Sequence, residues 1–506
     1  MTWYQDLEPP IRDEADFIVR EFAEHHIDIA GVPTENGLGV AFMYAEGQLL
    51  ARERYLEPIQ EVLADRAQAE VVKRVIKDIV LLKISFAADN HDRSAESDES
   101  ASEGNGGNSQ GNETPPEGDG ETSEGEQPTL LRLLDEIDAR LGPGIATLDH
   151  VLTVAGDPSP CPATEPQEVY DPVPYPPVCP AGGDRVRIYV ADTGVFHQTV
   201  TTTSWLGGVS GDNDPRIAAD GTILPYGGHG TFVAGVIRCL APDAEIVVKN
   251  VFNIAGSQLE SNFVPDLYQG FSYGAEIFHL TVASPTRHNL PLIAFEAWLE
   301  DLHQHKGVVC VVAAGNSDSG LPYWPAAFPG MVSVGALSAD WRSRAYFSNY
   351  GGWVDVYAPG QNLVNAFATG PYKCHVAPHA GEIRHFYGMA QWSGTSFSTP
   401  IVTGLIAARM ARCGESGKEA AAALLAEARA QTIRNVGPVL FPGCCDDERC
   451  GRCGGRGGHC GCGGEHGCGS GCGGHGGCRR GGGCGCGGGC GCGGGCGCGG
   501  GGGRRR

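Results

Sequence analysis

The stretch Gly394-Thr395-Ser396-Phe397-Ser398-Thr399-Pro400 joins a glycine-bearing turn to an apolar run at residues 401–408. The run predicts a buried helix. Ser396 would then stand at a helix N-terminus, where unpaired backbone N–H groups and the positive end of the dipole favour an anion. Acyl transfer requires this arrangement, because a nucleophilic hydroxyl must lie beside donors for the oxyanion that forms on attack. Serine, threonine and proline at a helix start also act as a plain cap, so the stretch alone leaves both interpretations open.

Composition and charge limit the partners that the chain can have. Its 506 residues are enough for two or more domains. A formal net charge of -24 argues against nucleic acid or an acidic membrane as a partner. No run of about 18 apolar residues occurs, so no membrane span is predicted.

The N-terminal residues predict the compartment. Residues 1–10 have neither the basic nor the apolar region of a secretory signal peptide. We therefore expect a cytoplasmic protein, in which the cysteines of the central region remain thiols. Non-classical export is the alternative, and it would oxidise the cysteines of the C-terminal tail.

Two segments, 1–86 and 128–156, carry the patterns of one small α+β domain. The apolar periodicity predicts helices at 13–24 and 129–141, strands at 37–44, 48–55, 79–84 and 146–154, and a turn at 45–47. Residues 87–127, between the two segments, are Gly, Ser and acidic residues with almost no apolar side chains. Such a composition predicts a disordered acidic linker or insert. The Pro-rich residues 157–182 predict an extended connector.

A compact α/β pattern covers residues 183–432. Near-continuous apolar strands are expected at 186–191, 244–251, 277–283 and 308–314, alternating with helices. This pattern predicts a parallel sheet covered by helices on both faces. Functional residues on such sheets gather at the C-terminal ends of strands, where Asp192 and Asn316 fall.

Four residues in this region can take complementary catalytic roles. Ser396 attacks a carbonyl carbon, His229 accepts and returns its proton, and Asp192 holds the imidazole tautomer. Asn316 can donate its side-chain amide to the oxyanion. Each residue also has a plainer interpretation, as a turn cap for Asp192 and Asn316 or as a hydrogen-bonded core side chain for His229.

The motifs around these residues favour the catalytic interpretation. They are Asp192-Thr193-Gly194, His229-Gly230-Thr231, Ala313-Ala314-Gly315-Asn316 and residues 394–400. Their order along the chain, Asp, His, Ser, is that of subtilisin. The chain resembles the subtilisin-like serine peptidases (subtilase family, peptidase S8) over residues 183–432. The resemblance implies the subtilisin-like α/β fold, endopeptidase activity on polypeptide substrates, catalytic Asp192, His229 and Ser396, and Asn316 in the oxyanion hole. It implies no cofactor for the chemistry.

The expected substrate-binding strand departs from the family pattern. The comparable stretch, residues 279–284, lacks the flexible glycines that the family usually has there. The backbone at Leu280, Thr281, Val282 and Ala283 is expected to pair with substrate as an added strand, so specificity can differ from that of subtilisin.

Two stretches of the sequence carry side chains of the kind that bind metal ions. Residues 372–387 look like an insertion with Cys374, His375, His379 and His385, whose irregular spacing does not predict a metal site. Family members often bind structural calcium, but no ligands can be assigned, and residues 212–214 are expected to be a solvated acidic loop.

The two ends of the chain suggest regulation and a separate tail. The N-terminal region occupies the place of a propeptide, so we expect an intramolecular inhibitor, with an independent recognition domain as the alternative. Residues 444–506 hold 15 of the 21 cysteines among glycines and predict a disordered low-complexity tail. Thiol-bound Zn²⁺ or Cu(I) is the competing interpretation of the tail. For the whole chain, the alternatives to a peptidase are a catalytically silent binding protein and a metal- or redox-binding tail carried by a peptidase.

Overall fold

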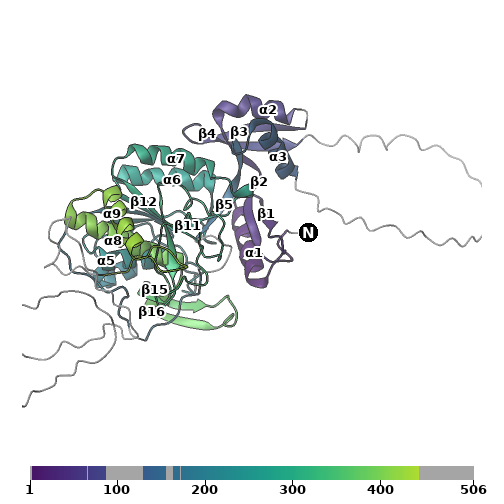
Figure 1. Ribbon diagram of the computed structural model, residues 1–506. Coiled ribbons are helices and arrows are strands. Elements are labelled where there is room, and N and C mark those ends of the chain that lie inside the picture. Colours follow the sequence, from purple (N-terminus) through teal and green to yellow (C-terminus); the bar gives the residue numbers. More distant parts are fainter. Residues whose placement is uncertain (1–2, 65, 87–128, 155–162, 171, 444–506) are drawn as a thin grey trace, which may run out of the picture. The chain divides into compact units, whose positions relative to one another are not determined.

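The computed structural model describes residues 3–64, 66–86, 129–154, 163–170 and 172–443 (Figure 1). The acidic segment 87–127 and the tail 444–506 lie outside the described residues, so the structure does not test the predictions made for them. None of the helices that the structure describes is long and apolar enough to cross a membrane.

An antiparallel sheet forms the N-terminal domain, in the order β5-β2-β4-β3 with β1 beside β2. The strands are β1 (Ile29–Pro33), β2 (Val40–Arg52), β3 (Ala67–Ile76), β4 (Ile79–Phe86) and β5 (Ala146–Val154), and the helices are α1 (Pro9–Ala23), η1 (Glu53–Tyr55), α2 (Leu56–Leu63) and α3 (Thr129–Leu141). Because β5 pairs with β2, the segments before and after the acidic stretch build one sheet. Helices α2 and α3 pack on one face of this sheet, around Leu82, Leu134 and Leu148.

Several predicted elements of this domain differ in detail. The helix at 129–141 and the strand at 146–154 are confirmed, but the two strands expected at 37–44 and 48–55 are one strand, β2. Gly47 has φ +69° and lies where the register between β2 and β5 shifts, so the turn-like sequence makes a bulge instead of a hairpin. Helix α2 and strand β3 were not predicted.

The other face of the N-terminal sheet is also apolar and packs against the rest of the chain. Leu50, Ile79, Leu81 and Leu152 share a buried cluster with side chains of α6 (Glu260–Tyr273) and α7 (Ile293–Gln304). Ion pairs border this contact: Arg52–Glu296 at 2.8 Å, Lys77–Asp301 at 2.8 Å and Arg287–Asp138 at 2.7 Å. Both faces of β5 and of most of β4 are therefore buried, whereas β3 is largely exposed.

Seven parallel strands form the α/β domain, in the order β14-β13-β12-β10-β6-β8-β7. They are β6 (Arg187–Asp192), β7 (Val209–Gly211), β8 (Glu245–Asn250), β10 (Ile277–Leu280), β12 (Val309–Ala313), β13 (Val332–Leu337) and β14 (Val356–Pro359). The shorter strands β9 (Ser257–Leu259) and β11 (Val282–Ala283) pair with β5 instead.

Helices cover both faces of this parallel sheet, as predicted. Ile188 and Val190 on β6 face a cluster with α5 (His229–Leu240), α8 (Thr395–Cys413) and α9 (Gly417–Ala430), whereas Tyr189 and Ala191 face α6 and α7. Figure 1 shows α6 and α7 on one side of β12 and α8 and α9 on the other. The remaining short helices are α4 (His197–Thr202), η3 (Ser204–Leu206) and η4 (Arg287–Asn289).

The predicted insertion at 372–387 is the outer part of a long hairpin, β15 (Leu363–Lys373) and β16 (Ile383–Trp392). The connector lies along this hairpin: Gln167 pairs with Gln391, and Glu165 Oε1 accepts a hydrogen bond from the Tyr372 hydroxyl at 3.1 Å. The described part of the connector is therefore anchored by specific contacts instead of being a plain spacer.

The cysteines of the folded region correct one expectation. Cys239, Cys310 and Cys374 are buried free thiols, but Cys179 and Cys413 are disulfide-bonded. Cys413 ends α8, and the connector passes the same helix end, where Asp184 N donates to Ala411 O at 3.1 Å. The prediction that all central cysteines remain thiols is wrong.

Replacement of Phe278 tests the sheet–helix packing. Its ring is fully buried on β10 and contacts Tyr189, Phe271 and Trp298. Phe278→Ala should lower the free energy of unfolding by about 3–5 kcal/mol, because it leaves a cavity between sheet and helices. Denaturant unfolding followed by tryptophan fluorescence measures this loss. Tyr387→Ala, at a side chain 85% exposed, is the control and should change stability by less than about 0.5 kcal/mol. Equal effects would contradict the packing described.

Candidate active site

Asp192 and His229 are in contact, and the His229 ring packs against Phe397, the residue after Ser396. Asp192 ends β6, His229 begins α5, and Ser396 lies in the first turn of α8. The His229 Nδ1 and Asp192 Oδ1 atoms are 2.7 Å apart. All three residues are 0% exposed, so the site is closed to solvent.

The Asp192 carboxylate is held by donors on each oxygen. Thr281 Oγ1 donates to Oδ2 at 2.7 Å, and Thr193 N donates to Oδ1 at 2.7 Å. Burial by itself would raise the pKa of Asp192, but the neighbouring His229 and the hydrogen bonds from His229, Thr281 and Thr193 hold it below its usual value. The residue is therefore an anion at neutral pH and can orient the imidazole.

The serine and the histidine are not yet joined by a hydrogen bond. In the part of the chain that the structure describes, neither Ser396 Oγ nor His229 Nε2 has a hydrogen-bond partner. The His229 ring packs edge-on against Trp392 and is tilted against Phe397, with centroids 5.7 and 5.2 Å away. Catalytic hydrogen bonds are often long without substrate, so this geometry is compatible with a base that engages later.

Asn316 follows β12 and is tied to the residue that precedes Ser396. Its Oδ1 atom accepts from Thr395 N at 2.8 Å and from Thr395 Oγ1 at 2.9 Å. Asn349 supports the same loop, because its Nδ2 donates to Ala314 O at 2.9 Å and its Oδ1 accepts from Ser317 N at 3.0 Å. No pattern in the sequence indicated Asn349, which lies 33 residues after Asn316 and outside the motifs.

The expected substrate-binding residues divide into two groups. Leu280 packs its side chain into the core, and Thr281 bonds to Asp192. Val282 and Ala283 form β11, which pairs antiparallel with Val154 and Thr153 of β5. On its other edge β5 pairs with β9, and Val154 N donates to Gly256 O at 3.0 Å. The last strand of the N-terminal domain thus lies between β9 and β11, and β11 holds Val282 and Ala283, two of the residues predicted to pair with substrate.

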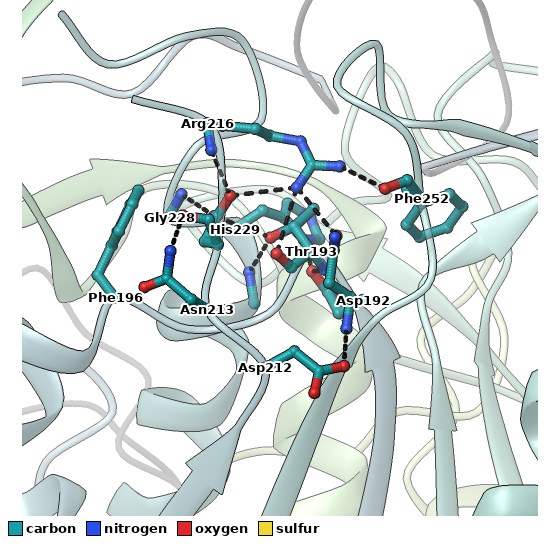
Figure 2. A network of polar contacts seen from close by, with 12 residues as sticks. Asp192, Thr193, Phe196, Asp212, Asn213, Arg216, Gly228, His229 and Phe252 are labelled. Carbon is teal, nitrogen blue, oxygen red and sulfur yellow. Dashed lines mark hydrogen bonds and ion pairs between the residues drawn. The ribbon is translucent and has the colours of Figure 1, made fainter. Parts of the chain in front are cut away.

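A polar network surrounds the turn that carries His229 (Figure 2). Asp214 and Arg216 form an ion pair of 3.1 Å in which both side chains are 0% exposed. The prediction of a solvated loop at 212–214 is therefore wrong for Asp214. Sequence reasoning missed Arg216, because nothing in the local pattern around residues 214–216 indicates a buried cation.

Acidic and histidine side chains that the sequence offered for metals are engaged otherwise. Asp212 pairs with Lys249 Nζ at 2.8 Å, and His379 pairs with Glu382 at 3.0 Å. Within the described ranges, the side chains close enough to share a metal ion are Asp135, Asp138 and His288. Arg287 already forms ion pairs with both of these carboxylates, which disfavours a second cation there.

A second buried histidine, His279, connects the sheet to the helix of Ser396. Its Nδ1 atom lies 2.8 Å from Thr403 Oγ1 on α8. Burial lowers the pKa of His279 to about 3. His279 therefore stays neutral at physiological pH and adds no positive charge near the His229 ring.

Thr281→Val tests the support of Asp192. The variant leaves a buried carboxylate oxygen without its donor and should cost about 1–3 kcal/mol of stability at pH 7. Because the pKa of Asp192 is lower folded than unfolded, this support is fully present above the unfolded pKa and is lost as the pH falls through the folded pKa. Urea unfolding at pH 7 and near pH 3 should give a smaller difference from wild type at the lower pH.

Thr201→Val is the control, since Thr201 Oγ1 donates to a helix carbonyl, Gln198 O, at an exposed site. It should be close to wild type at both pH values. An equal loss for Thr281→Val at both pH values would contradict a charge-dependent contact.

Known proteins resemble this chain over the α/β domain. A family model described as the Subtilase family matches residues 183–437. Subtilisin Savinase from Lederbergia lenta is 30% identical over 234 residues, which cover 44% of this chain and 76% of that protein. M-protease from Shouchella clausii is also 30% identical, but the match covers 54% of its length, so the chain spans about half of that relative.

Among solved structures, a cold adapted subtilisin-like serine proteinase is 24% identical with a TM-score of 0.38, over 51% of this chain and 89% of that one. The protease domain of PatA, in an S218A mutant, is 23% identical with a TM-score of 0.41, over 51% of this chain and 93% of that one. The family model itself spans half of the 506 residues. The chain belongs to the subtilase family.

Proposed function

We propose that this protein is a serine endopeptidase that hydrolyses peptide bonds through Asp192, His229 and Ser396 and a covalent acyl-enzyme. The observation that carries the proposal is the 2.7 Å contact between the buried Asp192 and His229, beside a serine at the start of α8. The four sequence motifs and family membership support it.

In the proposed reaction, Ser396 Oγ attacks the carbonyl carbon of the scissile bond. His229 Nε2 takes the hydroxyl proton and later gives it to the leaving amine. Asp192 keeps the Nδ1–H tautomer in place and stabilises the imidazolium. A water molecule, activated by the same histidine, then hydrolyses the acyl-enzyme and releases the second product.

Asn316 is the proposed side-chain donor to the oxyanion. Its Oδ1 atom accepts two bonds from Thr395, which favours an amide group turned with its nitrogen away from that residue. The N-terminal end of α8 adds backbone N–H groups and a favourable dipole for the negative charge.

The N-terminal domain is proposed to be an intramolecular inhibitor of this site. Its strand β5 fills the space between β9 and β11, where a substrate strand would pair. Asp149 on β5 accepts from Ser261 N at 3.0 Å, at the start of α6. Processing is proposed within the Pro-rich connector, residues 157–182.

The disulfide-bonded cysteines bear on the compartment in which the proposed enzyme works. Disulfide-bonded Cys179 and Cys413 favour an oxidising compartment over the cytoplasm predicted from residues 1–10. Structural calcium and thiol-bound metal on the tail remain proposals from the family resemblance and the cysteine content, and the chemistry proposed above needs neither.

A fluorophosphonate probe tests the nucleophile and the oxyanion donor. Ser396→Ala should abolish labelling and leave the chain uncleaved, whereas Ser398→Ala, two residues away, should still label. Asn316→Ala should lower peptide hydrolysis about a hundred- to a thousandfold, because the oxyanion loses a donor. Mass spectrometry of the labelled peptide and steady-state hydrolysis measure these outcomes. Well-folded wild type that neither labels nor processes would favour a catalytically silent binding protein.

Val151→Asp tests inhibition by β5. Val151 is 2% exposed and packs with Ala255 and Leu259 beside the β5–β9 pair. A buried carboxylate should weaken docking, so probe labelling of Ser396 should become faster. Val173→Asp is the matched control, at a side chain 59% exposed, and should label at the wild-type rate. A Val151→Asp variant that folds and labels no faster would argue for a recognition domain instead.

A further inference from the structure

The guanidinium of Arg216 lies at the centre of the polar network in Figure 2, with no exposed surface. Its Nη1 atom donates to Asp214 Oδ1 at 3.1 Å, to Thr193 O at 3.2 Å and to Asn250 Oδ1 at 3.2 Å. Its Nη2 atom donates to the carbonyls of Phe252, at 3.1 Å, and Asn253. One side chain thus joins the ends of β6 and β8 and the loop that precedes β9.

The network reaches the backbone on both sides of His229. Asp214 Oδ2 accepts from Gly228 N at 2.8 Å, and Thr193 Oγ1 accepts from Gly230 N at 3.0 Å. Thr193 Oγ1 also donates to Asp214 Oδ2 at 3.2 Å. The two amides that flank His229 are therefore fixed by the residues that Arg216 holds.

The same arginine reaches the edge that pairs with β5. Asn253, whose carbonyl accepts from Arg216, uses its Oδ1 atom to accept from Ser257 N and Ser257 Oγ, each at 3.0 Å. Ser257 begins β9 and pairs with Thr153 of β5. The side chains of Asn253, Arg216 and Asp214 thus link β9, and any strand paired with it, to the turn that carries His229.

Burial makes this connection stiff. A buried ion pair tolerates loss of a partner poorly, because the remaining charge is left uncompensated in the interior. The β8–β9 loop and the His229 turn share Arg216 and Asp214, so neither can shift without breaking contacts of the charged pair. Displacement of one is therefore expected to displace the other.

We propose that Arg216 and Asp214 are positioning residues that couple occupancy of the β9 edge to the placement of His229. The inference rests on the proposed peptidase function. The ligand is an extended polypeptide with enough residues before the scissile bond to pair with β9 as β5 does. Such a substrate raises kcat as well as binding, because pairing with β9 orders the base through Asn253, Arg216 and Asp214.

The test compares two chromogenic substrates, one with two residues before the scissile bond and one with five, on the chain after cleavage in the connector and release of β5 from the β9 edge. In the wild type the longer substrate should have the higher kcat. Arg216→Met should lower kcat for the longer substrate about ten- to a hundredfold and kcat for the shorter substrate by less. The difference is expected because only the longer substrate pairs with β9 and so places the base through Arg216. Arg216→Lys should restore part of the gain.

Two further variants keep the outcome interpretable. Arg238→Met removes another buried arginine, on α5 but outside this network, and should keep the length dependence of kcat even if stability falls. Asn253→Ala removes the two side-chain bonds to Ser257 and no charge, although Asn253 N still donates to Ser257 O. It should lower the gain, so it decides the matter if Arg216→Met fails to fold.

The probe reaction separates the two proposals. Wild type that does not label overturns the peptidase function itself. Wild type that labels, with full length dependence of kcat in folded Arg216→Met or Asn253→Ala, overturns the coupling alone. A change confined to KM would likewise overturn it, since the arginine would then act in binding only.

Discussion

The buried carboxylate of Asp192 is the constraint on which the centre of the α/β domain depends. A buried carboxylate is tolerated only when hydrogen-bond donors reach the lone pairs of its oxygens. Here the donors are His229 on α5, Thr281 between β10 and β11, and the backbone of Thr193. The sheet order places β6 between β10 and β8, so these segments converge at one edge of the sheet. Core packing and the placement of the polar site are thus consequences of the same topology.

The N-terminal domain packs against the α/β domain through a second apolar face of its own sheet. Its sheet has one apolar face under α2 and α3 and another against α6 and α7. Separation of the two domains would expose the second face, including Leu50, Leu81 and Leu152, at a cost of about 25 cal/mol for each Å². The strand β5 is then held by its whole sheet as well as by β9 and β11. An inhibitory role in the proposed enzyme would accordingly require cleavage or unfolding of this domain before the site opens.

Local patterns in the sequence were enough to predict the parallel sheet, and local motifs together with the family resemblance singled out Asp192, His229, Asn316 and Ser396. Each sits where a strand ends or a helix begins, and such boundaries are visible in apolar periodicity. The long-range features escaped prediction. The bulge at Gly47, the pairing of the connector with β16 and the burial of Asp214 all depend on partners distant in the chain. A polar residue in a loop has the same local signature whether it is solvated or buried against a distant cation.

The geometry of the polar network explains why the buried cation near the site is an arginine, Arg216. Arg216 donates to five acceptors that belong to four segments, and only a planar fork of N–H groups can meet them together. A lysine ammonium offers three donors from one point and is more strongly hydrated, so it could not donate to all five of these acceptors. The arginine also balances the charge of Asp214, which leaves Asp192 as the carboxylate bonded to the His229 ring. Charge and shape together therefore favour arginine at this position, whatever peptide occupies the β9 edge.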